Sequence, residues 1–349
     1  MNSPKKNHKN IISQKYNYGL GLLKVISALA IVRTHNFNFK STKNKILRNL
    51  LKERLSHVPS FFIMSFNFMH NLLLSLNIKA YLKRLERLLI PYILWPIIIF
   101  ILNNFILNNY IKIKKFSFNN LKYQYLIGRG IMDILWFQWT LIFLTTIFFF
   151  IIYLSKKKYL FLIQIFGCFS YSIQYSGYNR KLINYSRPEM KFTLGKFFES
   201  VPFASTGFTL GSFNILNIIQ NYKIQTLFFC IYLFYSLDKY SIITDLKYAN
   251  SYSGLLYNVR AVCLVFIFSL FPSNKITNKS IEKIIKYITN YTAGVYYLHP
   301  TIITYLKNII NPIKNHSLLG IFIIYLICYL ICFIGMQIFG KTKIKYLFS

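Results

Sequence analysis

The sequence predicts an all-α integral membrane protein, a bundle of about ten transmembrane helices. Hydrophobic residues make up 54% of the 349 residues and aromatic residues 19%, whereas only 14% are charged. Apolar runs of about twenty residues recur along the chain, and each is long enough to cross a bilayer as a helix. The chain contains no internal repeat and no linker rich in Pro, Gly or Ser, so we expect one helical domain with short connections.

Ten apolar windows define the predicted spans. They cover residues 17–35, 58–77, 88–108, 133–154, 159–176, 193–217, 225–240, 252–272, 290–310 and 317–340. We therefore expect a transmembrane domain over 17–340, between a basic N-terminal tail (1–16) and a basic C-terminal tail (341–349). The start of the chain imitates a secretory signal. Because Lys24 interrupts the apolar run, we expect it to be retained as the first span.

The charge of the chain is strongly positive, with 42 Lys and Arg against 8 Asp and Glu. These basic residues lie between apolar runs, where they anchor helix ends and meet anionic membrane lipids. A nucleic-acid-binding protein would instead carry a basic face on a soluble fold, so we expect no nucleic-acid partner. Basic residues divide almost equally between the two sides of the predicted membrane. Only dense short connections, such as Lys156-Lys157-Lys158, favour cytoplasmic termini.

The first span carries two ionisable side chains. Lys24 and His35 are 11 positions apart, which is close to three helical turns, so they share one face roughly 16 Å apart along the axis. A Lys inside a bilayer costs on the order of 3 kcal/mol, which favours a functional role over packing. The alternative is that Lys24 reaches a lipid headgroup and His35 lies in the interface.

A second basic group precedes the third predicted span, in the segment KAYLKRLERLLIPYILW (79–95). Arg84 and Arg87 are three residues apart and are therefore neighbours on one helical face. Two adjacent guanidiniums can clamp a phosphate or a carboxylate. A generic basic collar around the helix is the alternative. Glu86 is the only acid nearby, and we expect it to pair with one of the two arginines.

Several further segments follow these two basic motifs in a recognisable order. They are PSFFIMS (59–65), LWFQW (135–139), VPF with two later glycines (201–211) and GVYYLHP (294–300). Together the motifs resemble the acyltransferase-3 family of multi-pass membrane acyltransferases, over essentially the whole chain. Two departures stand out. Lys24 replaces the family's usual Arg and loses its bidentate geometry, and Phe66 replaces a glycine, where a bulky ring would hinder close helix packing and affect the acceptor pocket.

The resemblance implies transfer of an acyl group, commonly acetyl, from cytoplasmic acyl-CoA to a hydroxyl. The acceptor would be a glycan, a lipid-linked sugar or another molecule handled at the membrane. His35 would inherit the role of the proposed catalytic histidine, with Lys24 in the place of the basic residue that accompanies it. Arg84 and Arg87 would correspond to a motif that holds the donor phosphates. Acyl-CoA, with acetyl-CoA as the expected form, is then a co-substrate, and no metal is implied.

The chemistry of the residues agrees with this implication. Acyl transfer to an alcohol needs a base that titrates near neutral pH, and histidine is the usual supplier. We expect His35 to deprotonate the acceptor hydroxyl while the thioester lies along the Lys24 face, and a cation, amide or hydroxyl to stabilise the oxyanion. A covalent acyl-enzyme on Ser27 or Ser65 stays open.

Other polar residues in the spans have structural explanations. We expect Asp133 to mark a helix N-terminus, with orientation of the catalytic imidazole as the alternative. Lys196 and Glu199 are three apart and are expected to pair. Arg260 is a further candidate for donor or acceptor contact without a predicted partner.

The remaining histidines and the cysteines are expected to be structural. His299 would cap a kinked helix at Pro300, with a polar role in the cavity as the alternative. His57 and His70 lie near the ends of the second span and are expected at the interface. The five cysteines fall within apolar segments and form no metal-ligand or disulfide pattern.

Two other functions compete with acyl transfer. A transporter or flippase could use the intramembrane charges to line a pathway, but it would be favoured by inverted repeats or paired broken helices, which the sequence does not display. A catalytically degenerate relative of the same family would explain the departures at Lys24 and Phe66. Dependence of activity on acyl-CoA separates an acyltransferase from a transporter. Loss of activity on mutation of His35 separates an acyltransferase from a degenerate relative.

Overall fold

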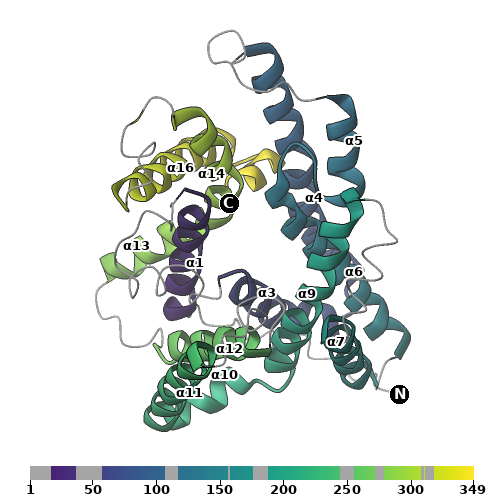
Figure 1. Cartoon of the computed structure of the whole chain (residues 1–349), viewed down its shortest axis with the longest axis vertical. Helices are drawn as coiled ribbons and strands as arrows, with labels where there is room; N and C mark the ends of the chain where they lie inside the picture. The colour runs from purple at the N-terminus through teal and green to yellow at the C-terminus, as the bar shows by residue number, and fades with distance from the viewer. Residues whose placement is uncertain are drawn as a thin grey trace, which may run out of the picture.

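A computed structural model shows a bundle of helices (Figure 1). It describes residues 17–36, 57–106, 117–155, 158–175, 188–243, 255–271, 279–307, 310 and 318–349, and no strand occurs in these ranges. The long helices are α1 (Tyr18–Asn36), α3 (His57–Leu74), α4 (Ile78–Ile101), α6 (Trp136–Ser155), α7 (Tyr159–Tyr175), α9 (Pro188–Ser212), α11 (Lys223–Ile243), α12 (Leu255–Ser269), α14 (Thr292–Leu306) and α16 (Leu318–Phe339). The short helices are η2 (Leu102–Ile106), α5 (Phe118–Ile127), η4 (Asp133–Leu135), α10 (Ile215–Ile218), η5 (Ile219–Tyr222), α13 (Lys279–Asn290) and η7 (Lys343–Leu347).

Each predicted span overlaps one of the long helices. Within the described residues, three stretches are long and apolar enough to cross a membrane: Ile78–Phe105, Asp133–Ser155 and Leu319–Phe339. Three shorter apolar helices accompany them. The all-helical membrane fold is therefore supported, whereas ten crossings and the cytoplasmic termini stay predictions. The N-terminal tail (1–16) and Lys156-Lys157 lie outside the described residues.

Helix α4 begins ten residues before the apolar window that predicted it, at Ile78 instead of 88. The Asn77 side chain caps this start by accepting a hydrogen bond from the Ala80 N–H at 3.1 Å. Hydropathy alone cannot detect these amphipathic first turns, because their charged residues lower the average. Arg84 and Arg87 therefore lie on α4 itself, in helical register with the apolar part of the span.

Helices α3 and α9 pack closely against each other along much of their length. A Cβ added at Gly207 of α9 would overlap the Ile63 carbonyl oxygen, so glycine is needed for this approach. Phe66, expected to hinder close packing, is fully buried elsewhere on α3, with its ring 4.8 Å from the ring of Phe148 on α6. Helix α9 thus supplies the small residue that the α3 motif lacks.

Helix α1 occupies a central position and packs against α3, α12, α13, α14 and α16 (Figure 1). Residues 341–349, predicted as a basic tail, fold back so that η7 packs against α4 and α16. Figure 1 marks the end of the chain beside α14, in the space between α1 and α4. The last residues thereby pack against the arginine-bearing helix α4.

Candidate functional site

A cavity of about 530 Å³ brings together three of the four residues selected from the sequence. Lys24 of α1 lines it together with Arg84 and Arg87 of α4. The Nζ of Lys24 also lies 5.1 Å from the ring centroid of Phe68 on α3. The cavity is also lined by polar and aromatic side chains of α3, α6, α14 and the segment after α16, including Ser65, Phe137, Gln138, Thr292, Tyr296, Tyr297, Lys345 and Tyr346.

This cavity is strongly cationic. Lys24, Arg84, Arg87 and Lys345 line it, and no Asp or Glu side chain is among its described lining residues. The Nε of Arg84 is buried and makes no hydrogen bond in the described structure. Since a buried charged donor without an acceptor is costly, this arrangement favours an anionic ligand.

Glu86 does not pair with either arginine, contrary to expectation. It forms an ion pair with Lys343 of η7 instead. The hydrogen bond from Lys343 to this carboxylate raises the pKa of the lysine. The sequence could not reveal this partner, because it lies more than 250 positions along the chain. The pairing directs the one nearby acid away from the arginines.

A hydrogen-bonded chain of side chains fixes one wall of the cavity. The Tyr297 hydroxyl donates to Gln138 Oε1 at 2.6 Å, and Gln138 Nε2 donates to the Leu88 carbonyl at 2.8 Å. These bonds join α14, α6 and α4 beside Arg84. No role for Gln138 is predicted from the sequence. The feature that could have revealed it is a polar amide within an apolar span. A buried amide side chain is costly unless it is hydrogen-bonded.

His35 does not line this cavity among the described residues. Its exposed side chain lies near the end of α1, with the ring centroid 5.1 Å from that of His299 on α14. Tyr296, which lines the cavity, lies 6.0 Å from His299 between ring centroids. A contiguous path of side chains therefore leads from the cationic cavity through Tyr296 and His299 to His35.

The His299 side chain is fully buried, and only one of its two ring nitrogens has a hydrogen-bond partner. Pro300 has no N–H, so the Tyr296 carbonyl loses its helical donor, and His299 Nδ1 lies 2.8 Å from that oxygen. A carbonyl can only accept, so the neutral imidazole carries its proton on Nδ1 and presents a lone pair at Nε2. This Nε2 is buried without a hydrogen-bond partner. The expected structural role of His299 beside Pro300 therefore accounts for one ring nitrogen, and the other remains for another role.

Asp133 begins η4, immediately before α6, and its carboxylate lies 3.2 Å from Arg129 Nε. It is also near enough to His35 to interact with it electrostatically. The expected position at a helix start is therefore confirmed, and the alternative role toward the imidazole stays open. The Asp133 side chain is 66% exposed, so solvent weakens both interactions.

Other polar residues of the spans are paired. Lys196 and Glu199 form the predicted ion pair, with 2.6 Å between Nζ and Oε2. The guanidinium of Arg260 is buried and donates to the Leu237 carbonyl of α11 at 3.3 Å. The ring of His70 is buried, with Nδ1 near the Asn67 carbonyl, and Gly211 leaves room for it; its position at the membrane interface stays a prediction. The side chain of His57 lies outside the described residues.

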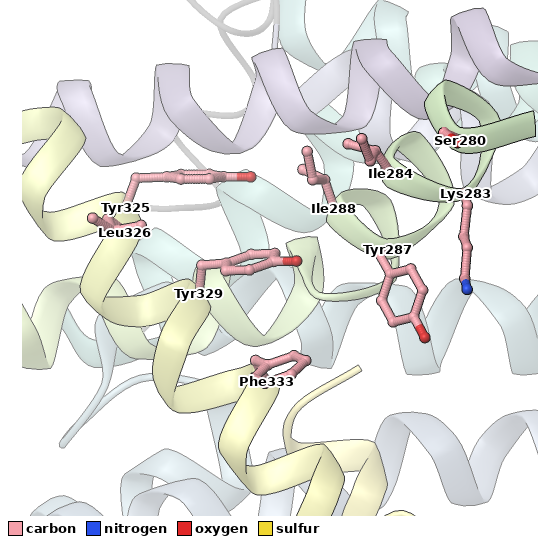
Figure 2. Close-up of a pocket in the computed structure, with 9 residues that line it drawn as sticks. All are labelled: Ser280, Lys283, Ile284, Tyr287, Ile288, Tyr325, Leu326, Tyr329 and Phe333. Atoms are coloured by element: carbon pink, nitrogen blue, oxygen red, sulfur yellow. The ribbon is translucent and has the colours of Figure 1, made fainter. Parts of the chain in front are cut away.

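A second cavity, of about 650 Å³, lies between α13 and α16. Figure 2 shows the Tyr325 and Tyr329 hydroxyls pointing from α16 toward α13. Its other lining residues are aliphatic or aromatic, apart from Ser280 and Lys283. Because Lys283 is the one charged side chain among its described lining residues, this cavity is poorly suited to a polyanion.

Comparison with protein families identifies the chain. The sequence model of the acyltransferase-3 family, described as an acyltransferase domain, matches residues 17–337. No curated protein matches, and no solved structure matches. The matched region covers almost the whole chain and includes α1, α4 and α14, which position His35, the arginine pair and His299. The chain therefore belongs to the acyltransferase-3 family and is a membrane acyltransferase.

Proposed function

We propose that the protein moves an acyl group, with acetyl as the expected one, from acyl-CoA to a hydroxyl of a glycan or another membrane-associated acceptor. The observation that carries the proposal is the convergence of Lys24, Arg84 and Arg87 on one cavity, with His35 a short path away. CoA carries several phosphate charges, which fit a cationic cavity without acidic side chains among its described lining residues. The unpartnered Nε of Arg84 supplies a donor for one phosphate oxygen.

This placement supports the following proposed reaction. His35 accepts the proton of the acceptor hydroxyl as its oxygen attacks the thioester carbonyl carbon. Negative charge develops on the carbonyl oxygen, and an amide, a hydroxyl or a cation close to His35 stabilises it. Lys24 lies about three helical turns from His35, so its proposed role is to hold the donor along the face of α1 that the two residues share. The intermediate then expels the thiolate of CoA, which takes the proton from the imidazolium, and the acyl ester leaves on the acceptor. Atoms and protons balance without a further reactant.

His299 acts in this proposal as a positioning residue. Its Nδ1 proton is fixed by the Tyr296 carbonyl, so Nε2 can accept a hydrogen bond from a ring N–H of His35. Such a bond would leave the other His35 nitrogen as the base. Hydrogen bonds of this kind are often long before substrate binds and tighten in the reacting complex.

The test is transfer of label from radiolabelled acetyl-CoA into material of membranes that contain the wild-type chain. His35→Ala, at matched protein level, should lower transfer by about 10²–10⁴-fold, the usual contribution of a general base. His299→Ala should lower it by a smaller factor, and His299→Gln, whose side-chain oxygen can accept the same bond, should restore part of the rate. His299→Leu, which offers no hydrogen-bond acceptor, should not restore the rate, whereas a structural role alone would not distinguish Gln from Leu at this position.

Two outcomes would overturn the proposal. Full transfer by His35→Ala would remove the histidine from the reaction. Absence of transfer by the wild type, with a panel of acyl donors and native lipids and glycans, would favour a transporter or a degenerate relative. A labelled product would instead identify the acceptor class directly.

A further inference from the structure

The segment that follows α16 lies beyond the region matched by the family, which ends at residue 337. It nevertheless contributes Lys345 and Tyr346 to the lining of the cationic cavity. Figure 1 shows the chain returning after α16 to the space between α1 and α4. The family resemblance assigns these residues no role, so any role rests on their contacts.

Aromatic packing fixes the segment in place. The ring of Phe348 stacks on Phe339 with centroids 6.0 Å apart and meets the edge of Trp95 at 6.3 Å. The Leu347 side chain is buried. Glycine at 294 on α14 allows the backbone of Phe348 to approach, since a Cβ there would press on its carbonyl. The segment is thus part of the packed structure around the cavity.

The charges of the segment have a clear division. Lys343 forms an ion pair with Glu86, the acid closest in sequence to Arg84 and Arg87. Lys345 and Arg87 both approach the ring of Tyr346, with Nζ and Cζ each 5.6 Å from its centroid. One aromatic ring therefore holds two cations near one another at the cavity wall. Neighbouring cations repel, and an anion between them would relieve that repulsion.

We propose that Lys345 and Tyr346 complete an anion-binding site with Arg84 and Arg87, and that this site takes phosphate groups of the nucleotide end of acyl-CoA. The inference rests on the proposed function for the identity of the donor. It goes beyond that function by adding a binding contribution from outside the family region. Lys345 binds a phosphate oxygen, and Tyr346 positions Lys345 and Arg87.

The experiment measures binding of radiolabelled CoA, which has no acyl group to transfer, to the full chain in phosphatidylcholine nanodiscs. Lys345→Ala should raise the Kd about tenfold, the low end for a hydrogen bond to a charged group, and Lys345→Arg should restore most of the affinity. Tyr346→Leu should weaken binding about threefold, and Tyr346→Phe should not, because the ring is kept. Lys341→Ala is the matched control, since Lys341 is exposed and does not line the cavity.

Inorganic pyrophosphate is the second probe and separates this inference from the donor assignment. If the wild type binds pyrophosphate but not CoA, and Lys345→Ala loses pyrophosphate, the anion site stands and acyl-CoA is the wrong donor. If Lys345→Ala binds both probes as the wild type does, the inference is wrong. If phosphatidylglycerol in the nanodiscs displaces CoA from the wild type but not from Lys345→Ala, the lysine holds a lipid headgroup, and its role toward CoA is overturned.

Discussion

The cationic cavity and the cavity between α13 and α16 are similar in size, about 530 and 650 Å³, but the chain builds them differently. The first is assembled from helices at both ends of the sequence and collects four cations. The second lies between two helices that are close in sequence, and tyrosines and aliphatic side chains dominate its lining. Charge, and not volume, therefore distinguishes the cavity that suits a phosphorylated donor.

Among the variants that compare the two cavities, the largest expected effect comes from removing the arginine with the unpartnered donor. Arg84→Ala should raise the KM for acetyl-CoA by about 10–100-fold, because hydrogen bonds to charged groups contribute about 1.5–3 kcal/mol. Arg84→Lys should recover only part of this, since it lacks the planar guanidinium. The control is Lys283→Ala in the other cavity, whose KM should match the wild type. If Arg84→Ala and Lys283→Ala raised the KM for acetyl-CoA equally, the two cavities would not differ in donor binding.

Lys24 should show opposite effects on activity and stability. Lys24→Met should lower transfer about tenfold through loss of a cation that holds the donor in the cavity. It should also raise the melting temperature in detergent, because a cation in an apolar span costs on the order of 3 kcal/mol. Activity assays and thermal unfolding of the same preparations check both. A variant that is less active and also less stable would indicate a structural lysine.

Gly294 tests the connection between α14 and the segment that closes the cavity. Gly294→Val should push against Cys332 and the Phe348 backbone, which would lower stability by about 1–3 kcal/mol. CoA binding should weaken by a few-fold as Lys345 and Tyr346 shift. Thr304→Val, at an exposed position of the same helix, is the control for both measurements. Unchanged CoA binding in a destabilised Gly294→Val protein would separate packing of this segment from donor binding.

The smallest effect is expected in the apolar cavity. Tyr329→Leu should leave the KM for acetyl-CoA within about twofold of the wild type, since the side chain meets no described cation of the donor site. Steady-state kinetics in the same membranes measure it. A KM increase comparable to that of Arg84→Ala would show that the donor reaches both cavities.

Much of the helical arrangement follows from the sequence. Apolar runs of bilayer length predicted where the long helices lie, because a membrane requires internally hydrogen-bonded segments of that length. Hydropathy missed the first turns of α4 and treated the last residues as a tail, since charged, amphipathic turns lower its average. The Lys196–Glu199 pair was predictable from helical spacing alone.

The sequence by itself determined which residues are costly in a membrane: Lys24, His35 and the arginine pair stand out because burying a charge is expensive wherever it occurs. Only the tertiary structure decided which of them meet. It joined Lys24 to Arg84 and Arg87, placed His35 beside His299, and gave Glu86 to Lys343. These contacts connect positions far apart in the chain, and they depend on how whole helices pack, which short-range periodicity does not encode.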